Sequence, residues 1–172
     1  MKLVIENLIM ISLAALILFA VSCSENSTSN DDNALEWNKK IAKYAVHNHA
    51  MVLSELIKPL SNPQEIILLI RKSIDSVRFY EDKSGYFYVY DYNCVNIAHA
   101  TQKDKEGQNL YDYQDTKGKY VVRELAEAAS KGGGYVEFYW QKPGETLQSK
   151  KLGYVEPIRG TNYFIGSGVY LE

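Results

Sequence analysis

The stretch 85–99 constrains the fold more than any other part of the sequence, because its pattern is typical of two β-strands joined by a tight polar turn. In the first strand the side chains alternate between two faces, so a row of tyrosines shares one side while Phe87 and Val89 share the other. The row consists of Tyr86, Tyr88 and Tyr90. A buried tyrosine normally needs a partner for its hydroxyl, so the row indicates either a sheet surface in water or the wall of a polar pocket.

The length and charge of the chain narrow its class. With 172 residues, 46% of them hydrophobic, the chain is sized for one globular domain plus a short appendage. The formal net charge is −2, and the lysines and arginines are scattered along the sequence. A nucleic-acid-binding protein would carry a clustered basic surface, so we exclude that class.

The appendage lies at the amino terminus. An apolar run from Leu8 to Val21, broken only by Ser12, ends at Cys23 and an abrupt polar tract. The run is shorter than the roughly 18–20 residues that span a bilayer, and it fits the apolar region of a secretory signal. An uncleaved single anchor is the alternative.

The small residue before Cys23 resembles the processing site of bacterial lipoproteins, in which the cysteine becomes the lipidated first residue. We therefore expect a lipoprotein-type signal peptide at 1–22, a flexible tether at 23–33 and one folded domain at 34–172. This organisation places the domain in the bacterial cell envelope, periplasmic or at the outer surface, attached to the membrane through its lipid anchor.

The remaining sequence predicts an α+β fold. Apolar residues at three and four spacing predict a long helix over 34–57, and Asn62-Pro63-Gln64-Glu65 is a capping signal for a second one. A third helix is expected at 119–130, capped by Asp115 or Thr116, before three strands at 135–142, 149–157 and 163–171. With the strand pair of 85–99, these give an antiparallel sheet of about five strands.

We expect neither a metal nor a cofactor. His47 and His49 are two residues apart on the first helix, so they lie on different faces, and we expect both in solvent. The loop 101–115 lacks the ligand pattern of a calcium site, and the triple glycine at 132–134 follows a helix instead of opening one. Cys94 fits a small buried apolar residue.

From Ser61 onward the order of motifs resembles the single Cache family of extracellular sensory domains, in its second subgroup. The motifs are Asn-Pro-Gln-Glu at 62–65, Gly-Tyr-Phe-Tyr-Val at 85–89, His99, Gly-Gln-Asn-Leu-Tyr-Asp at 107–112, Asp-Thr-Lys-Gly-Lys at 115–119, Gly-Gly-Gly-Tyr-Val-Glu-Phe-Tyr-Trp at 132–140, Lys-Leu-Gly-Tyr-Val at 151–155 and Ile-Gly-Ser-Gly-Val-Tyr at 165–170. The resemblance implies a PAS-like antiparallel sheet packed on a long N-terminal helix, with a small-molecule pocket on one face. It also implies extracellular sensing for chemoreceptors or histidine kinases, with small organic acids among the ligands.

The resemblance also implies a set of ligand-binding residues. They are Tyr86, Tyr88, His99, Trp140, Lys151 and Tyr154. Tyr88 stands where the family often has Trp, Ala100 where it often has Pro, and Phe138 where it often has Tyr, so the ligand can differ from those of better-known members.

The chemistry of these side chains fits a short carboxylic acid. Such an acid needs donors for two oxygens and an apolar enclosure for its tail; tyrosine hydroxyls, His99 and Lys151 supply donors, and Trp140 supplies a wall. Each residue also has a purely structural alternative: tyrosines on a sheet surface, Trp140 in the core, His99 at a strand end and Lys151 exposed on a strand.

The sequence thus predicts an extracytoplasmic domain that binds a small organic acid or similar metabolite and reports it to a partner signalling protein, a chemoreceptor or histidine kinase. One alternative is a structural or adhesion lipoprotein of the envelope without a ligand. Another is a hydrolase that uses His99 with Asp91 or Asp112, although no catalytic signature of such an enzyme is present. We expect no enzymatic activity.

Overall fold

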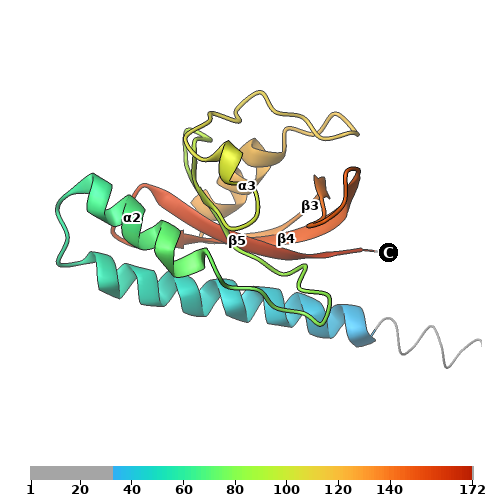
Figure 1. The fold of residues 1–172 in the computed structure, drawn as a ribbon, viewed down its shortest axis with the longest axis horizontal. Helices are drawn as coiled ribbons and strands as arrows, with labels where there is room; N and C mark the ends of the chain where they lie inside the picture. Colours follow the sequence, from blue (N-terminus) through green and yellow to red (C-terminus); the bar gives the residue numbers. More distant parts are fainter. Residues whose placement is uncertain (1–32, 172) are drawn as a thin grey trace, which may run out of the picture. The chain divides into compact units, whose positions relative to one another are not determined.

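The secondary structure follows the order expected from the sequence (Figure 1). A computed structural model describes residues 33–171. A helix covers residues 33–57. After it come α2 (Pro63–Ile74), β1 (Tyr88–Asp91), β2 (Asn96–His99), the short 3₁₀ helix η1 (Lys103–Lys105), α3 (Val121–Ser130), β3 (Gly134–Gln141), β4 (Gln148–Ile158) and β5 (Tyr163–Tyr170). The predicted α+β class with a five-stranded antiparallel sheet is confirmed.

The helix at 33–57, referred to below as the N-terminal helix, is amphipathic. Its buried side carries apolar residues three or four apart, among them Val46, Ala50 and Leu53. The opposite side leaves large apolar residues exposed, and within the compact unit that begins at Asn38 they include Tyr44 and Met51. One face of this helix is therefore used for packing, and a second apolar face is left in solvent.

The caps of the other two helices differ in how well the sequence predicts them. At α2, the Asn62 Oδ1 accepts a hydrogen bond from the Gln64 N–H at 2.9 Å and Pro63 is the first helical residue, as expected. At α3, the N-cap is Tyr120, which makes no side-chain cap bond. The expected cap at Asp115 or Thr116 is wrong, because the Asp115 carboxylate holds the preceding loop and β3 instead.

The sheet has the strand order β2-β1-β5-β4-β3, and each neighbouring pair is antiparallel. β1 and β2 form the predicted hairpin, whose turn is closed by Asp91 Oδ1 accepting from the backbone N–H groups of Asn93 and Val95. Tyr88 lies directly opposite His99, so the two side chains share one face. A bulge between Val89 and Tyr90 shifts the register.

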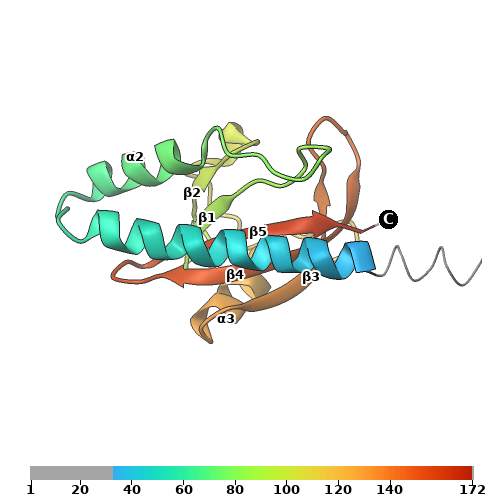
Figure 2. The same ribbon diagram turned by 90° about the horizontal axis from the view of Figure 1, so that it is seen from below.

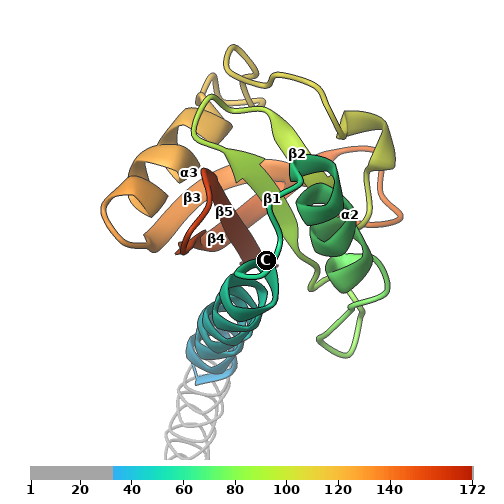
Figure 3. The same ribbon diagram turned by 90° about the vertical axis from the view of Figure 1, so that its left-hand side faces the viewer.

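The two faces of the sheet are covered by different helices (Figures 2 and 3). The N-terminal helix covers one face, where His47 Nδ1 lies 3.0 Å from Glu156 Oε2 on β4 and Ser54 Oγ accepts from the Arg159 N–H. His49 packs on this face too, stacked on Phe87 at 4.6 Å between ring centroids and half-buried. The expectation that His49 is solvated was therefore wrong. On the other face, α3 packs its buried Val122 and Leu125 toward the sheet.

The edge strand β3 is covered by the loop that precedes α3. Lys119 Nζ donates to the Glu137 carbonyl at 2.6 Å, and Asp115 Oδ2 accepts from the Tyr139 N–H at 2.9 Å. These bonds occupy backbone groups that point away from β4. The middle of β3 therefore has few free backbone donors and acceptors with which an added strand could pair.

Residues 33–171 contain neither a membrane-spanning helix nor a cluster of metal ligands. No helix there combines the length and apolarity needed to cross a bilayer. In the same range, no cluster of three or more His, Cys, Asp or Glu side chains is arranged to hold a metal ion.

Candidate functional site

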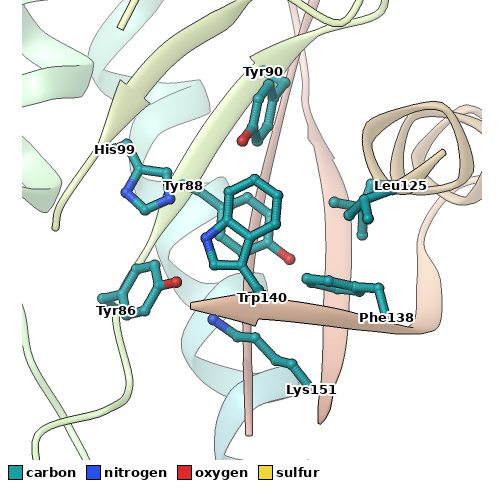
Figure 4. Close-up of a pocket in the computed structure, with 9 residues that line it drawn as sticks. Tyr86, Tyr88, Tyr90, His99, Leu125, Phe138, Trp140 and Lys151 are labelled. Atoms are coloured by element: carbon teal, nitrogen blue, oxygen red, sulfur yellow. The ribbon is translucent and has the colours of Figure 1, made fainter. Parts of the chain in front are cut away.

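A small cavity lies between the sheet and α3 (Figure 4). It is lined by Tyr86, Tyr88, Tyr90, His99, Val121, Leu125, Phe138, Trp140 and Lys151. All of these residues are buried. The free space is about 10 Å³, on the scale of one water molecule. Any larger ligand must displace lining side chains to enter.

Two glycines in the sheet make room for Tyr88. Tyr88 pairs with Gly166 on β5, where an added Cβ would lie 2.4 Å from the tyrosine Cε2. At Gly153 on β4, an added Cβ would lie 2.8 Å from the Tyr88 hydroxyl and 2.7 Å from Phe138 Cε1. The Tyr88 ring therefore lies across the sheet only because both positions lack a side chain, and this placement brings its hydroxyl into the cavity.

The amine of Lys151 is buried in this cavity, and the described part of the protein does not offset its burial with a hydrogen bond. Its side chain is fully buried, and its Nζ has no hydrogen-bond partner within the described part of the chain. The nitrogen is surrounded by tyrosine rings, at 3.9 Å from the centroid of Tyr86, 4.6 Å from that of Tyr170 and 5.7 Å from that of Tyr88. Burial holds the pKa of Lys151 well below its usual value.

His99 is fixed in one tautomer. Its Nδ1 accepts the backbone N–H of Gln102 at 3.0 Å and that of Thr101 at 3.3 Å, so the ring proton sits on Nε2. Burial, followed by the charges of Lys151 and Lys105, holds the pKa of His99 well below its usual value. His99 is consequently a neutral hydrogen-bond donor at physiological pH.

Gln102 ties the loop after β2 to β3. Its Oε1 accepts from Trp140 Nε1 at 3.0 Å, and its Nε2 donates to Gln141 Oε1 at 3.1 Å. Together with its backbone bond to His99, this places one loop residue in contact with two cavity-lining rings. Gln102 orients the indole without itself lining the cavity.

The tyrosine hydroxyls of the cavity are neutral. Burial raises the pKa of Tyr86 to about 12, and it also raises the pKa of Tyr88 and that of Tyr90 above the usual value. The Tyr86 hydroxyl lies 3.2 Å from that of Tyr170, which donates to the Gln141 carbonyl at 2.7 Å. The cavity therefore holds several O–H groups but no negative charge of its own.

The structure brings all but one of the expected site residues together. The residues that line the cavity are Tyr86, Tyr88, His99, Trp140 and Lys151. Tyr154 lies elsewhere: it is three residues from Lys151 on β4, so its side chain points to the opposite face, where its hydroxyl donates to Glu156 Oε1 at 2.8 Å. The expected ligand role of Tyr154 does not fit this placement.

Other residues at the cavity were not among the expected ones. They are Tyr90, Val121, Leu125 and Phe138. Tyr90 alternates in phase with Tyr86 and Tyr88, so the sequence pattern alone could have placed it among the residues that line the cavity. The positions Val121 and Leu125 belong to the apolar stripe of α3, which indicates burial but not which wall it forms. Cys23, the expected lipidation site, lies outside the described residues.

The sequence has relatives among sensory proteins. It matches the profile of the Cache domain over residues 10–172. It is 40% identical over 90 residues to the sensor histidine kinase MctS of Rhizobium johnstonii, covering 52% of this chain and 20% of that protein. It is 30% identical over 92 residues to the methyl-accepting chemotaxis protein McpP of Pseudomonas putida, covering 53% of this chain and 17% of that protein. The chain thus spans about a fifth of the length of these relatives.

Solved structures share the fold over most of the chain. A methyl-accepting chemotaxis protein from Vibrio parahaemolyticus superposes with a TM-score of 0.74 at 29% identity, covering 84% of this chain and 96% of that one. A Cache chemosensory domain, described for its recognition of carboxylic acids, superposes with a TM-score of 0.71 at 25% identity, covering 82% and 98%. Both agree with the resemblance drawn from the sequence motifs. With its profile match extending over nearly the whole length, this chain belongs to the Cache domain family.

Proposed function

We propose that this domain binds a small carboxylic acid in the cavity beside Lys151 and reports its presence to a signalling partner. Membership of the Cache family makes the chain a ligand-sensing domain outside the cytoplasm. The observation that carries the choice of ligand is the buried, unpartnered Lys151 Nζ. A buried amine without an acceptor is costly, and a carboxylate would supply both acceptor and charge.

The other lining residues would contact two different ends of the ligand, a polar end and an apolar end. The Nε2–H of His99 is a donor available to carboxylate oxygens. The hydroxyls of Tyr86 and Tyr88 would have to exchange bonds of 3.2 Å to Tyr170 and 3.5 Å to the Ser167 carbonyl for bonds to the ligand. Phe138, which pairs with Lys151 across β3 and β4, and Leu125 of α3 supply an apolar wall for the carbon chain, and the Lys151 Nζ points away from them toward Tyr86 (Figure 4). This division supports an acid with a short aliphatic tail.

The size of the cavity limits both the ligand and its affinity. A free space of about 10 Å³ favours the smallest acids, since each extra carbon requires more side-chain movement. A ligand of about five heavy atoms gains at most about 1.5 kcal/mol per atom, or roughly 8 kcal/mol, which corresponds to micromolar dissociation constants. Such affinity suits the sensing of metabolite levels.

The neighbouring structures support this choice of ligand. The Cache chemosensory domain that superposes on this chain is described for carboxylic acid recognition, and it is 25% identical to this chain. The relatives that match by sequence are a sensor histidine kinase and a chemotaxis protein. We infer that a chemoreceptor or histidine kinase receives the signal.

The hydrolase alternative gains no support. Asp91 accepts backbone N–H groups in the β1–β2 turn, and Asp112 pairs with Arg123. Neither carboxylate contacts His99, whose Nδ1 is already occupied by backbone donors. His99 therefore lacks the orienting carboxylate that a general base of this kind would need.

For the partner contact, we favour the exposed apolar side of the N-terminal helix over the sheet edge. Tyr44 and Met51 are 61% and 58% exposed on this helix, whereas β3 is covered by Lys119 and Asp115. In-cell crosslinking from position 44 that captures an identified chemoreceptor or kinase, and is lost in Met51→Glu, would support this contact. The same yield in both proteins would contradict it.

We also propose that a lipid on Cys23 anchors the domain in the cell envelope. Metabolic labelling with a fatty acid should mark the wild-type chain and leave Cys23→Ala unmarked. Equal labelling of both chains would contradict lipidation at this residue.

A thermal-shift screen tests the ligand class. The full chain is heated with acids of two to six carbons, amines and nucleobases, each at high concentration. At 100 times its dissociation constant, a ligand adds about 2.7 kcal/mol of stability, or about 5–10 °C for a domain of this size. A carboxylate hit that disappears in Lys151→Ala and Tyr88→Phe supports the site, whereas a hit that persists in both contradicts it. No stabilisation by any compound would favour a structural protein without a ligand.

A further inference from the structure

Within residues 33–171, no carboxylate pairs with the Lys151 Nζ. Tyr86, two residues before β1, and Tyr88 on β1 face its Nζ, and Tyr170 faces it from β5. His99 is the titratable group on β2, and burial is the largest cause that lowers its pKa. Burial raises the pKa of each tyrosine, so none of them supplies an anion near neutral pH.

Further charges that act on this space are also positive. Lys105 Nζ lies 5.7 Å from the centroid of the Trp140 ring, and the charges of Lys103 and Arg78 act on His99 as well. Glu106, which accepts from the His99 backbone N–H, is engaged by Arg71 and Lys103. The charge of Glu145 acts on Tyr170, but no carboxylate of residues 33–171 lines the cavity.

The balance of energies decides the charge of Lys151 in the empty cavity. The tyrosine ring faces attract an ammonium, but they do not replace the hydrogen bonds that its three N–H groups make in water. Removing an ion from water without such acceptors is strongly unfavourable even after relaxation. Within residues 33–171 no hydrogen-bond acceptor reaches the Nζ to offset this loss. The amine is therefore neutral when the cavity is empty, in agreement with the lowered pKa of Lys151.

We propose that the cavity takes up one proton with each carboxylate, so that Lys151 is neutral in the empty domain and an ammonium in the complex. The proton comes from the buffer and forms one N–H bond on Nζ; no other bond is made or broken. The net reaction adds the neutral acid to the protein. This inference rests on the proposed function, because it concerns the same cavity and the same ligand.

The same charge balance restricts the ligand to acids with one carboxylate. One ammonium forms, and it compensates one negative charge. A second carboxylate on the ligand would be buried beside tyrosine hydroxyls and apolar side chains, which is costly because Lys105, Lys103 and Arg78 do not line the cavity and so cannot pair with it there. The cavity should therefore accept propionate and reject succinate.

Lys151, and not His99, is the proton acceptor in this proposal. The His99 Nδ1 already accepts two backbone N–H groups, and a proton there would point at those donors. A charge on Lys151 further disfavours a charge on His99. The two side chains thus hold different roles: one gains a proton, and the other donates a hydrogen bond in its neutral form.

The test is isothermal titration calorimetry of the full chain with sodium propionate, in phosphate and in Tris at pH 7, 8 and 9. The heat difference between buffers gives the number of protons taken up. We expect a number close to one, and a dissociation constant that rises by up to tenfold per pH unit because each unit lowers the proton concentration tenfold. His99→Gln should bind more weakly but still take up close to one proton.

Each other outcome overturns a defined part of the account. Propionate binding with no proton uptake and no pH dependence would show that Lys151 keeps the same charge in the free domain and in the complex, which overturns this inference and leaves the proposed function standing. Proton uptake that vanishes in His99→Gln would assign the proton to His99. Succinate binding as tight as that of propionate would contradict the restriction to one carboxylate. Absence of binding by propionate and the other short acids would overturn the proposed function and this inference with it.

Discussion

The amine nitrogen of Lys151 lies 3.9 Å from the centre of the Tyr86 ring, and no hydrogen-bond acceptor within residues 33–171 reaches it. A protein interior rarely keeps such a group without a use, because a polar atom buried without a partner costs free energy of folding. In this cavity the cost is compatible with a site prepared for an acid. The predictions below separate this role from simple packing.

Replacing Lys151 by Met should stabilise the empty domain. The thioether fills a similar volume and removes a buried amine without a partner, which is worth about 1–3 kcal/mol. Chemical denaturation at pH 7 measures this difference. A loss of stability in Lys151→Met would mean that the amine has a stabilising partner in the empty protein.

The pH dependence of stability should report the same residue. The pKa of Lys151 is lowered in the folded state, whereas in the unfolded chain it is about 10.4, so between these values the unfolded state binds one more proton. The free energy of unfolding should therefore rise with pH in this range, by about 1.4 kcal/mol per unit. Denaturation of wild type and Lys151→Met at pH 7, 8 and 9 measures the slope. Equal slopes in the two proteins would contradict the neutral amine.

Gln102→Leu should weaken acid binding. Loss of the Gln102 side-chain amide leaves Trp140 Nε1 without an acceptor and removes the hydrogen bond to Gln141. The indole that forms one wall of the cavity is then no longer fixed. We expect affinity to fall by about 1–3 kcal/mol, or roughly five- to 150-fold. Gln102→Glu keeps an acceptor for the indole and should recover part of the affinity. A merely structural role would instead lower stability equally in both variants and leave binding unchanged.

Gly166→Ala should close the cavity. The added methyl group would lie 2.4 Å from Tyr88 Cε2, so the tyrosine ring must move into the ligand space or out of its place. We expect a loss of about 1–3 kcal/mol in stability together with loss of binding. Gly134→Ala is the matched control in β3, because its Cβ would meet Ala128 at an ordinary 3.6 Å. Equal effects of the two substitutions would contradict the role assigned to Gly166.

Asp115→Asn should destabilise the domain at neutral pH. The carboxylate accepts from the backbone N–H groups of Lys117, Lys119 and Tyr139, and an amide would turn a donor toward at least one of these donors. The expected cost is about 1–3 kcal/mol.

The effect of Asp115→Asn should depend on pH. Burial acts to raise the pKa of Asp115, but the hydrogen bonds from these backbone groups outweigh it, so the folded-state pKa is lowered. The stability contributed by the carboxylate is present above about pH 4, the usual value in unfolded chains, and is lost as pH falls through the lowered value. Denaturation curves of both proteins from pH 3 to 7 should converge toward acid. Curves that stay parallel would contradict this account.

The sequence predicted the elements of the fold well because their signals are local. The α2 cap depends on Asn62 and Pro63, and the β1–β2 hairpin on alternation and turn residues within a few positions. The α3 start was misplaced because Asp115 has a choice of partners. In the fold it reaches Tyr139 on β3, a contact that sequence spacing does not reveal.

The site was predicted less completely, for two different reasons. Tyr154 could have been rejected from the sequence, since it lies three positions from Lys151 on one strand and alternation puts the two on opposite faces. The role of Gln102 could not have been assigned, because its partners His99 and Trp140 meet it only after the loop folds onto β3. His49 likewise looks solvated until Phe87 is brought under its ring.

The most direct test of the central claim is a titration of wild type and Lys151→Met with propionate at pH 7, followed by calorimetry. The account predicts binding in the micromolar range for wild type and no detectable heat of binding for Lys151→Met, with both proteins folded. Equal affinity in the two proteins would contradict a carboxylate site built around Lys151.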